Sequence, residues 1–314
     1  MRISWYNDLQ SLLRKYIVIV AVAAVSYLVA QVFWWLSLYT FSVSTFLLSS
    51  VLAGMSLGIL YSYGIAEALS LTETKKGLYS GLVVTCFGLG SLFAAKAYSF
   101  LLPQGLHMVP CYVVLTLLVL CIGSALLNGD IRPSETSVGV FVRNSLWLKL
   151  YAVFFLNILV GLTLLTNYRG YSELRNLTPE DAIFLVGIAG LFNAGGRIVF
   201  SGISDFLGRL QIFQLVLVLQ TIILVFLPFQ WVLSLVLVAT YGAGFALMPS
   251  ICADLFKDGS AAYGALLSAW GLAAILAAVI AINIPDPFHI LLFLSAGCLC
   301  LITYIRKEIS HVGR

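Results

Sequence analysis

The chain alternates between long apolar stretches and short polar breaks. Ten stretches are long enough to cross a hydrocarbon core of about 30 Å, which takes roughly 20 apolar residues in a helix. They run at about 16–38, 43–66, 77–102, 107–127, 147–168, 179–204, 210–228, 231–253, 260–283 and 287–305. The breaks carry turn residues, as in Leu102-Pro103-Gln104-Gly105. Because the stretches are too long and too uniformly apolar for barrel strands, the pattern predicts an all-α membrane protein of about ten helices.

Composition supports a membrane protein and excludes a soluble one. The 314 residues are 61% hydrophobic and 10% charged, with a mean hydropathy of +1.04. A soluble domain normally carries about a quarter charged residues. The first fifteen residues do not have the form of a secretory signal, because charged Asp8, Arg14 and Lys15 interrupt them.

The basic residues predict the orientation. If the segment before the first span is cytoplasmic, the inner side collects thirteen of the 17 Lys and Arg residues: Arg2, Arg14, Lys15, Lys75, Lys76, Arg132, Arg143, Lys149, Arg209, Lys257, Arg306, Lys307 and Arg314. The outer loops keep Arg169 and Arg175. This bias predicts an even number of spans and two cytoplasmic termini in a multi-pass plasma membrane protein, or an inner-membrane protein if bacterial. No basic face is clustered, so no nucleic-acid partner is expected.

One arginine is predicted to lie deep in a span. Arg197 comes eight residues before Asp205, or about 12 Å along a helix, near the middle of the hydrocarbon core. A cation there costs about 3 kcal/mol or more unless it faces water or a partner, which indicates a function. A small and polar stripe surrounds it and predicts the wall of a water-filled cavity: Gly190, Asn193, Ala194, Arg197, Ser201 and Ser204. The guanidinium fork suits a carboxylate. Alternatively, Arg197 only braces a helix end or the Asp205 loop.

Two segments repeat a pattern. Glu67 is followed by Gly81 and Phe87-Gly88-Leu89, and Asp254 by Gly264 and Trp270-Gly271-Leu272. In each, an acidic residue lies at the end of one span. The next span begins with a glycine that is followed, after five residues, by an aromatic residue and Gly-Leu. Transporters are often built from repeated halves, whereas glycine is also ordinary packing material in membrane helices.

The longest local motif runs from Gly187 to Arg197 and continues as Gly202-Ile203-Ser204-Asp205-Phe206-Leu207-Gly208-Arg209. Here the sequence resembles the major facilitator superfamily of transporters, and more narrowly the oxalate/formate antiporter family of monocarboxylate-type carriers. Further segments carry the resemblance: Lys76-Gly77-Leu78-Tyr79-Ser80-Gly81, Phe87-Gly88-Leu89-Gly90, the run from Tyr241 to Pro249, and Ser268-Ala269-Trp270-Gly271.

The loop motif suits an inner gate. In the loop from Asp205 to Arg209, Asp205 can pair with a cation or with a helix end, while Gly202 and Gly208 allow close approach and a tight turn. The alternative is a solvated polar turn.

The resemblance implies twelve helices in two halves of six, with the ten spans here corresponding to the third through twelfth. It divides the chain into an incomplete N-terminal half of about four helices (1–128), a cytoplasmic linker (129–146) and a C-terminal six-helix half (147–314). It also places Arg197 at the anion-contacting position of the eighth helix. Members that carry oxalate have a lysine in the eleventh helix, and the matching stretch from Gly264 to Ile282 has none. A monoanion or another small carboxylate is therefore favoured over a dianion.

Other polar residues are weaker candidates. Lys96 either contacts the substrate or snorkels to the outer interface. Asn193 on the stripe, Asn157 and Tyr241 can add hydrogen bonds to a substrate, although Asn157 and Tyr241, like Tyr61 and Tyr63, also suit ordinary helix packing. The six cysteines lie in or beside apolar spans without metal-ligand spacing, which favours buried hydrophobes and predicts no metal or cofactor.

Together these features predict a monomeric carrier in the lipid bilayer that moves a small organic anion by alternating access. Exchange or facilitated diffusion is favoured over proton symport, because no histidine or carboxylate is predicted deep in the spans. The alternative is a truncated, non-transporting membrane protein, such as a sensor, an assembly partner or a decaying carrier. An enzyme is not expected, since no cluster of His, Cys, Asp or Glu shares one membrane depth.

Overall fold

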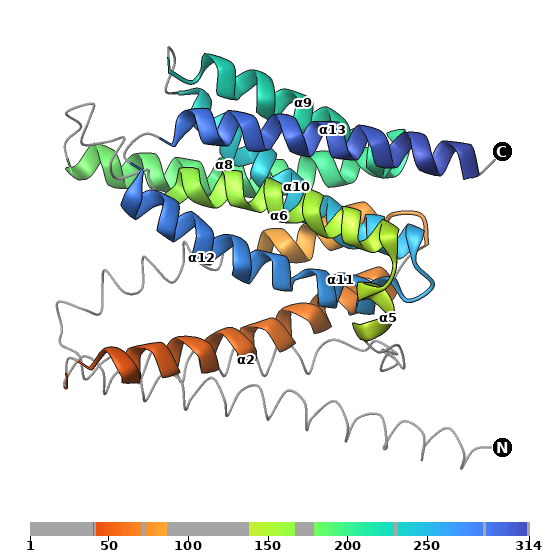
Figure 1. The fold of residues 1–314 in the computed structure, drawn as a ribbon, viewed down its shortest axis with the longest axis horizontal. Helices are drawn as coiled ribbons and strands as arrows, with labels where there is room; N and C mark the ends of the chain where they lie inside the picture. Colours follow the sequence, from red (N-terminus) through yellow and green to blue (C-terminus); the bar gives the residue numbers. More distant parts are fainter. Residues whose placement is uncertain are drawn as a thin grey trace. The chain divides into compact units, whose positions relative to one another are not determined.

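The computed structural model describes residues 40, 42–70, 73–86, 138–166, 179–228, 232–284 and 287–312, and within these ranges the chain is helical without a strand (Figure 1). The helices are α2 (Val43–Ser70), α5 (Val138–Val142), α6 (Ser145–Thr166), α8 (Pro179–Leu207), α9 (Arg209–Phe226), α10 (Leu233–Leu255), α11 (Gly259–Leu266), α12 (Ser268–Asn283) and α13 (Phe288–Val312), with a further helical segment at 76–86. The predicted all-α fold is confirmed. The predicted spans at 16–38 and 107–127 lie outside the described residues.

Five helical stretches are long and apolar enough to cross a membrane, counted over the described ranges. They are Ser145–Thr166, Arg209–Phe226, Leu233–Leu255, Gly259–Asn283 and Phe288–Ser310. The fourth, predicted as one continuous span over 260–283, is interrupted at Leu267 between α11 and α12. At this point the Ser268 hydroxyl donates to the Ala265 carbonyl at 2.9 Å and the Trp270 amide donates to the Leu267 carbonyl at 2.9 Å. A side-chain hydroxyl that binds the backbone in this way competes with the regular helical pattern.

The chain forms two compact units, one of Met1–Gly64 with Phe93–Asp130 and the other of Ile65–Leu92 with Ile131–Arg314. Residues 76–86 belong to the second unit because they pack closely on α8, where a Cβ at Gly81 would lie 2.9 Å from Ser201 Cβ. The predicted halves, 1–128 and 147–314, concern membrane topology and stay a prediction. Within the expected linker at 129–146 the structure has α5 and the first turn of α6.

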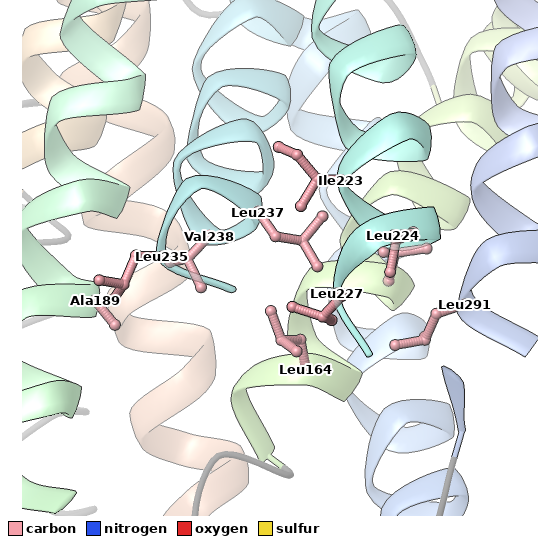
Figure 2. Packing of buried hydrophobic residues seen from close by; sticks show 10 residues of the cluster. Leu164, Ala189, Ile223, Leu224, Leu227, Leu235, Leu237, Val238 and Leu291 are labelled. Carbon is pink, nitrogen blue, oxygen red and sulfur yellow. The ribbon is translucent and has the colours of Figure 1, made fainter. Parts of the chain in front are cut away.

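Helix α10 lies at the centre of the second unit, in contact with α6, α8, α9 and α11, and is almost wholly buried. A leucine-rich cluster joins four of the surrounding helices (Figure 2). It includes Leu164 of α6, Ala189 of α8, Leu224 of α9, Leu227 directly after α9, Leu237 of α10 and Leu291 of α13. This packing holds α10 in a fixed position beside α8, which carries the candidate site.

Candidate functional site

Arg197 of α8 is a deeply buried charged residue, with 6% of its surface exposed. Its Nε donates to Asn193 Oδ1, one turn earlier on α8, at 3.1 Å. Its Nη1 donates to the backbone carbonyl of Val84 in the 76–86 segment. Both acceptors are neutral, and the ion pairs of the described residues include none to Arg197. Within the described part of the chain, the guanidinium charge is therefore buried without a counter-charge.

Aromatic rings border the guanidinium on the side of α10. The Arg197 Cζ atom lies 5.4 Å from the centroid of the Phe245 ring, within the range of a cation–π interaction. The Phe245 ring in turn lies 6.5 Å from the Tyr241 ring and 5.7 Å from the Trp270 ring of α12. The Arg197 guanidinium is thus bordered on one side by an apolar, aromatic surface.

Sequence analysis missed Phe245 and the Val84 carbonyl as neighbours of Arg197. Phe245 could have been predicted from its spacing, because it follows the candidate Tyr241 by four residues and residues i and i+4 lie on the same face of a helix. A backbone carbonyl such as that of Val84 leaves no signal in the residue type.

The small and polar stripe of α8 packs against protein, not against a water-filled cavity as predicted. The side chains of Ser201 and Ser204 are buried. The Ser204 hydroxyl donates to the Ser201 carbonyl at 2.6 Å, and the Ser201 hydroxyl donates to the Arg197 carbonyl, so both are satisfied within α8. The facing surface is the 76–86 segment, where Thr85 Oγ1 donates to the Ala194 carbonyl at 3.4 Å. Small residues serve here to bring two helices together.

The two predicted asparagine contacts have different surroundings. Asn193 binds Arg197 directly and lies against Gly242 of α10, where a Cβ would be 3.1 Å from the Asn193 carbonyl carbon. Asn157 of α6 is fully buried and donates to Gln220 Oε1 of α9 at 3.0 Å. The Nδ2 group of Asn157 is thus used inside the helix bundle, while its Oδ1 has no hydrogen-bond partner among the described residues, and its role in substrate binding stays a prediction.

Tyr241, the other predicted hydrogen-bonding contact, is also buried. Its ring packs on Gly161 of α6, where an added Cβ would lie 2.7 Å from Tyr241 Cβ. Through Phe245, Tyr241 belongs to the same aromatic group as the Arg197 site.

Asp205, at the end of α8, joins three segments. Its carboxylate accepts hydrogen bonds from the backbone amides of Gly77 at 2.8 Å and Leu78 at 2.9 Å, the first turn of the 76–86 segment. It also pairs with Arg209 Nη2 at 2.9 Å, and the Arg209 Nη1 reaches Asp254 at the end of α10. Sequence analysis expected Asp205 to bind a cation or a helix end, and the structure contains both contacts. It missed Asp254 as the second partner of Arg209, although the repeat had marked this residue.

The glycines of the loop motif differ in what they allow. Gly208 has φ = +92°, a conformation that favours glycine, and therefore makes the predicted tight turn between α8 and α9. Gly202 meets only Leu78 Cδ1 at 3.5 Å, an ordinary contact, so the close approach expected there is wrong. It is Gly77 and Gly81 on the opposite segment that let the backbones approach.

The remaining candidates have no structural support for a role in the site. Lys96 lies outside the described residues, as does the side chain of Tyr63, and Tyr61 is buried. Cys252 and Cys298 are buried as expected, whereas Cys86 and Cys300 are exposed, which corrects the prediction for these two. Within the described part of the chain no group of His, Cys, Asp and Glu could hold a metal ion.

The chain is similar in sequence to known transporters. A family model described as Major Facilitator Superfamily matches residues 13–278. An oxalate:formate antiporter of Oxalobacter formigenes is 28% identical over 258 residues, which cover 74% of this chain. The chain spans 62% of the length of that antiporter.

Solved structures of low sequence identity share the fold. The E. coli fucose:proton symporter aligns with a TM-score of 0.69 at 12% identity, covering 92% of this chain and 84% of the symporter. A bacterial homologue of the iron transporter ferroportin, in its outward-facing state, aligns with a TM-score of 0.61 at 18% identity, covering 94% of this chain and 84% of the homologue. Proteins of this family and fold are membrane transporters rather than enzymes. The family match, the helical bundle and the apolar spans together show that the chain belongs to the Major Facilitator Superfamily.

Proposed function

We propose that the protein carries a small organic anion, a monocarboxylate, across the membrane by alternating access, with Arg197 as its main contact to the anion. The buried guanidinium without a counter-charge carries this proposal. A buried cation is costly unless it is paired, and only neutral partners surround Arg197 in the described residues. An anionic substrate would supply the missing charge.

The geometry of the guanidinium favours a carboxylate. Two of its nitrogens, Nε and Nη1, already donate to Asn193 and Val84. The N–H groups of Nη2 have no hydrogen-bond acceptor in the described ranges, and a carboxylate oxygen is a strong acceptor for such groups. The rings of Phe245 and Trp270 suit the apolar part of an organic anion. The 28% identity to an oxalate:formate antiporter agrees with a carboxylate substrate.

A single positive charge favours a monoanion. In the described ranges no second basic residue is recorded in contact with Arg197, and α12 contains none. A dianion would retain an unpaired negative charge at such a site, which is costly in a membrane interior.

We further propose that Asp205 and Arg209 form an inner gate. Their bonds tie the end of α8 to the start of the 76–86 segment and to the end of α10, so an opening at this point must break charge-assisted hydrogen bonds. The same contacts reform when the path closes, which is what a reversible gate requires.

The test is uptake of radiolabelled mono- and dicarboxylates into proteoliposomes that contain the full chain. Arg197→Gln removes the charge, and Arg143→Gln is the control, because Arg143 is an exposed cation between α5 and α6. Loss of one charge-assisted hydrogen bond is worth about 1.5–3 kcal/mol, so we expect at least about tenfold slower monocarboxylate uptake for Arg197→Gln and unchanged uptake for the control. Size-exclusion profiles establish that both variants are folded. Unchanged uptake by a folded Arg197→Gln variant would contradict the proposal.

A further inference from the structure

A shallow groove of about 300 Å³ runs along the exposed face of α13. It is lined by Leu299, Cys300, Thr303, Tyr304 and Lys307, which lie three or four residues apart and therefore on one side of the helix. This groove is separate from Arg197 and from the Asp205 loop. It lies on a helix that is apolar enough to cross a membrane from Phe288 to Ser310.

The groove is apolar along most of its length. Thr303 presents its methyl group, because its hydroxyl donates to the Leu299 carbonyl at 2.7 Å and accepts a hydrogen bond from Gln214 Nε2 at 2.8 Å. Leu299 adds apolar surface, and the Cys300 thiol adds weakly polar surface. The Tyr304 ring is more than half exposed and forms one side.

One end of the groove carries an available positive charge. Lys307 follows Cys300 by seven residues, or about 10 Å along the helix axis. Its side chain is exposed, and no ion pair to it occurs in the described residues. Of the neighbouring cations, Lys149 pairs with Glu308 at 2.6 Å, while Arg306 donates to the neutral amide oxygen of Gln214 on α9 and does not line the groove.

The Lys149 pair also holds the groove in shape. The Lys149 Nζ atom lies 5.0 Å from the centroid of the Tyr304 ring while it is bound by both oxygens of Glu308. The ring is thus fixed by a cation whose charge is already neutralised. Among the residues that line the groove, Lys307 is the basic group that can attract an anion.

We propose that this groove binds an anionic phospholipid, with an acyl chain along Leu299, Cys300 and Tyr304 and the phosphate at Lys307. An apolar groove about 10 Å long that ends in a cation matches a molecule with an apolar chain and a negative headgroup. A soluble anion would gain only one exposed lysine, and a single exposed charge pair contributes little. A zwitterionic lipid would fill the groove equally well but without a net charge for Lys307.

The expected selectivity is modest. When the acyl chain enters the groove, it moves from the apolar bilayer to another apolar surface and therefore gains little from the hydrophobic effect. The preference between two lipids then depends on the charge of the headgroup. We expect about fivefold preference for anionic lipid, the ratio that corresponds to about 1 kcal/mol for one basic residue near the surface.

The experiment is native mass spectrometry of the full chain, purified in detergent and titrated with phosphatidylglycerol or phosphatidylcholine of the same acyl chains. In the parent, the amount of bound phosphatidylglycerol is expected to be about five times that of bound phosphatidylcholine. In Lys307→Gln this ratio is expected to fall to about one. Cys300→Trp, which fills the groove, is expected to lower retention of both lipids. Lys257→Gln is the control, since Lys257 is an exposed lysine in the turn between α10 and α11, away from the groove. An unchanged ratio in Lys307→Gln, or an equal loss in Lys257→Gln, would overturn the proposal.

A second measurement reports on the groove itself. Cys300 lines the groove and is exposed, and Cys86 is an exposed cysteine outside it, so maleimide labelling of the two can be compared in one protein. Phosphatidylglycerol is expected to slow labelling of Cys300 severalfold and to leave Cys86 unchanged, and Lys307→Gln is expected to remove this protection. Equal protection of Cys300 by glycerol phosphate, which has no acyl chain, would assign the site to a soluble anion and refute the lipid.

Discussion

The neighbouring glycines Gly195 and Gly196 of α8 provide a matched pair for testing how closely α8 and α10 pack. An added Cβ at Gly196 would lie 2.7 Å from the carbonyl carbon and 2.9 Å from the Cα atom of Ala239 on α10. An added Cβ at Gly195 would meet nothing within 4 Å. The substitutions Gly196→Ala and Gly195→Ala therefore add the same methyl group to the same helix in two different environments.

The magnitude follows from the distances. Carbon atoms in contact lie about 3.5–4.0 Å apart, so Gly196→Ala forces α8 and α10 to separate by about 1 Å. The obstacle is the Ala239 backbone, which cannot rotate aside as a side chain can. Overpacking of this kind costs about 1–3 kcal/mol. Both substitutions gain about 1 kcal/mol of helix propensity, so the expected difference in unfolding free energy between them is about 1–3 kcal/mol.

The assay is thermal unfolding in detergent, followed by the loss of the monodisperse peak of a fluorescent fusion in size-exclusion chromatography. One kcal/mol shifts Tm by about 2–4 °C for a domain of 150–250 residues. Gly196→Ala is therefore expected to unfold about 2–12 °C below Gly195→Ala, which should match or exceed the parent. Equal Tm values for the two variants would refute the close α8–α10 contact on which the position of Arg197 depends.

Three further predictions concern hydrogen bonds of the second unit. Asp205→Ala removes the acceptor of two backbone amides and is expected to cost about 2–3 kcal/mol, seen as a fall in Tm of several degrees; an unchanged Tm would count against the bridging role of Asp205. Trp147→Phe keeps an aromatic ring but loses the 3.0 Å bond from Nε1 to the Ala262 carbonyl and part of the buried indole, so a loss of at least about 1 kcal/mol is expected in the same assay. For Asn157→Leu and Gln220→Leu, the double variant is expected to be less destabilised than the sum of the two single ones, and strict additivity would argue against their 3.0 Å bond.

The helices were predictable from the sequence because lipid imposes a single strong rule. A spanning segment must be apolar and about 20 residues long, so the positions of α6, α9, α10 and α13 follow from hydropathy alone. The break at Leu267 was not predictable in this way. It depends on a hydroxyl that turns back to its own helix, and Ser268 has the same residue type whether or not it does so.

A site residue could be predicted where placing its side chain in the membrane costs much free energy. A cation in an apolar helix has few explanations, which is why Arg197 stood out. The stripe serines do not line a cavity as predicted, because a neutral polar group in a membrane can be satisfied by a neighbouring helix or by its own backbone. The sequence does not show which acceptor is near. Gln220 as the partner of Asn157 became evident only when α6 and α9 were seen side by side.

The contrast between two arginines explains why the charge at one of them is available. Arg209 is largely buried, with 12% of its side chain exposed, and it has two carboxylate partners in Asp205 and Asp254. Arg197 is as deeply buried but has only an amide oxygen, a backbone carbonyl and an aromatic ring. A protein that needed only a structural brace at Arg197 would gain from a nearby carboxylate, as it does at Arg209. The absence of such a carboxylate among the described neighbours is what the proposed binding of an exchangeable anion requires, because a permanent counter-charge would compete with that anion.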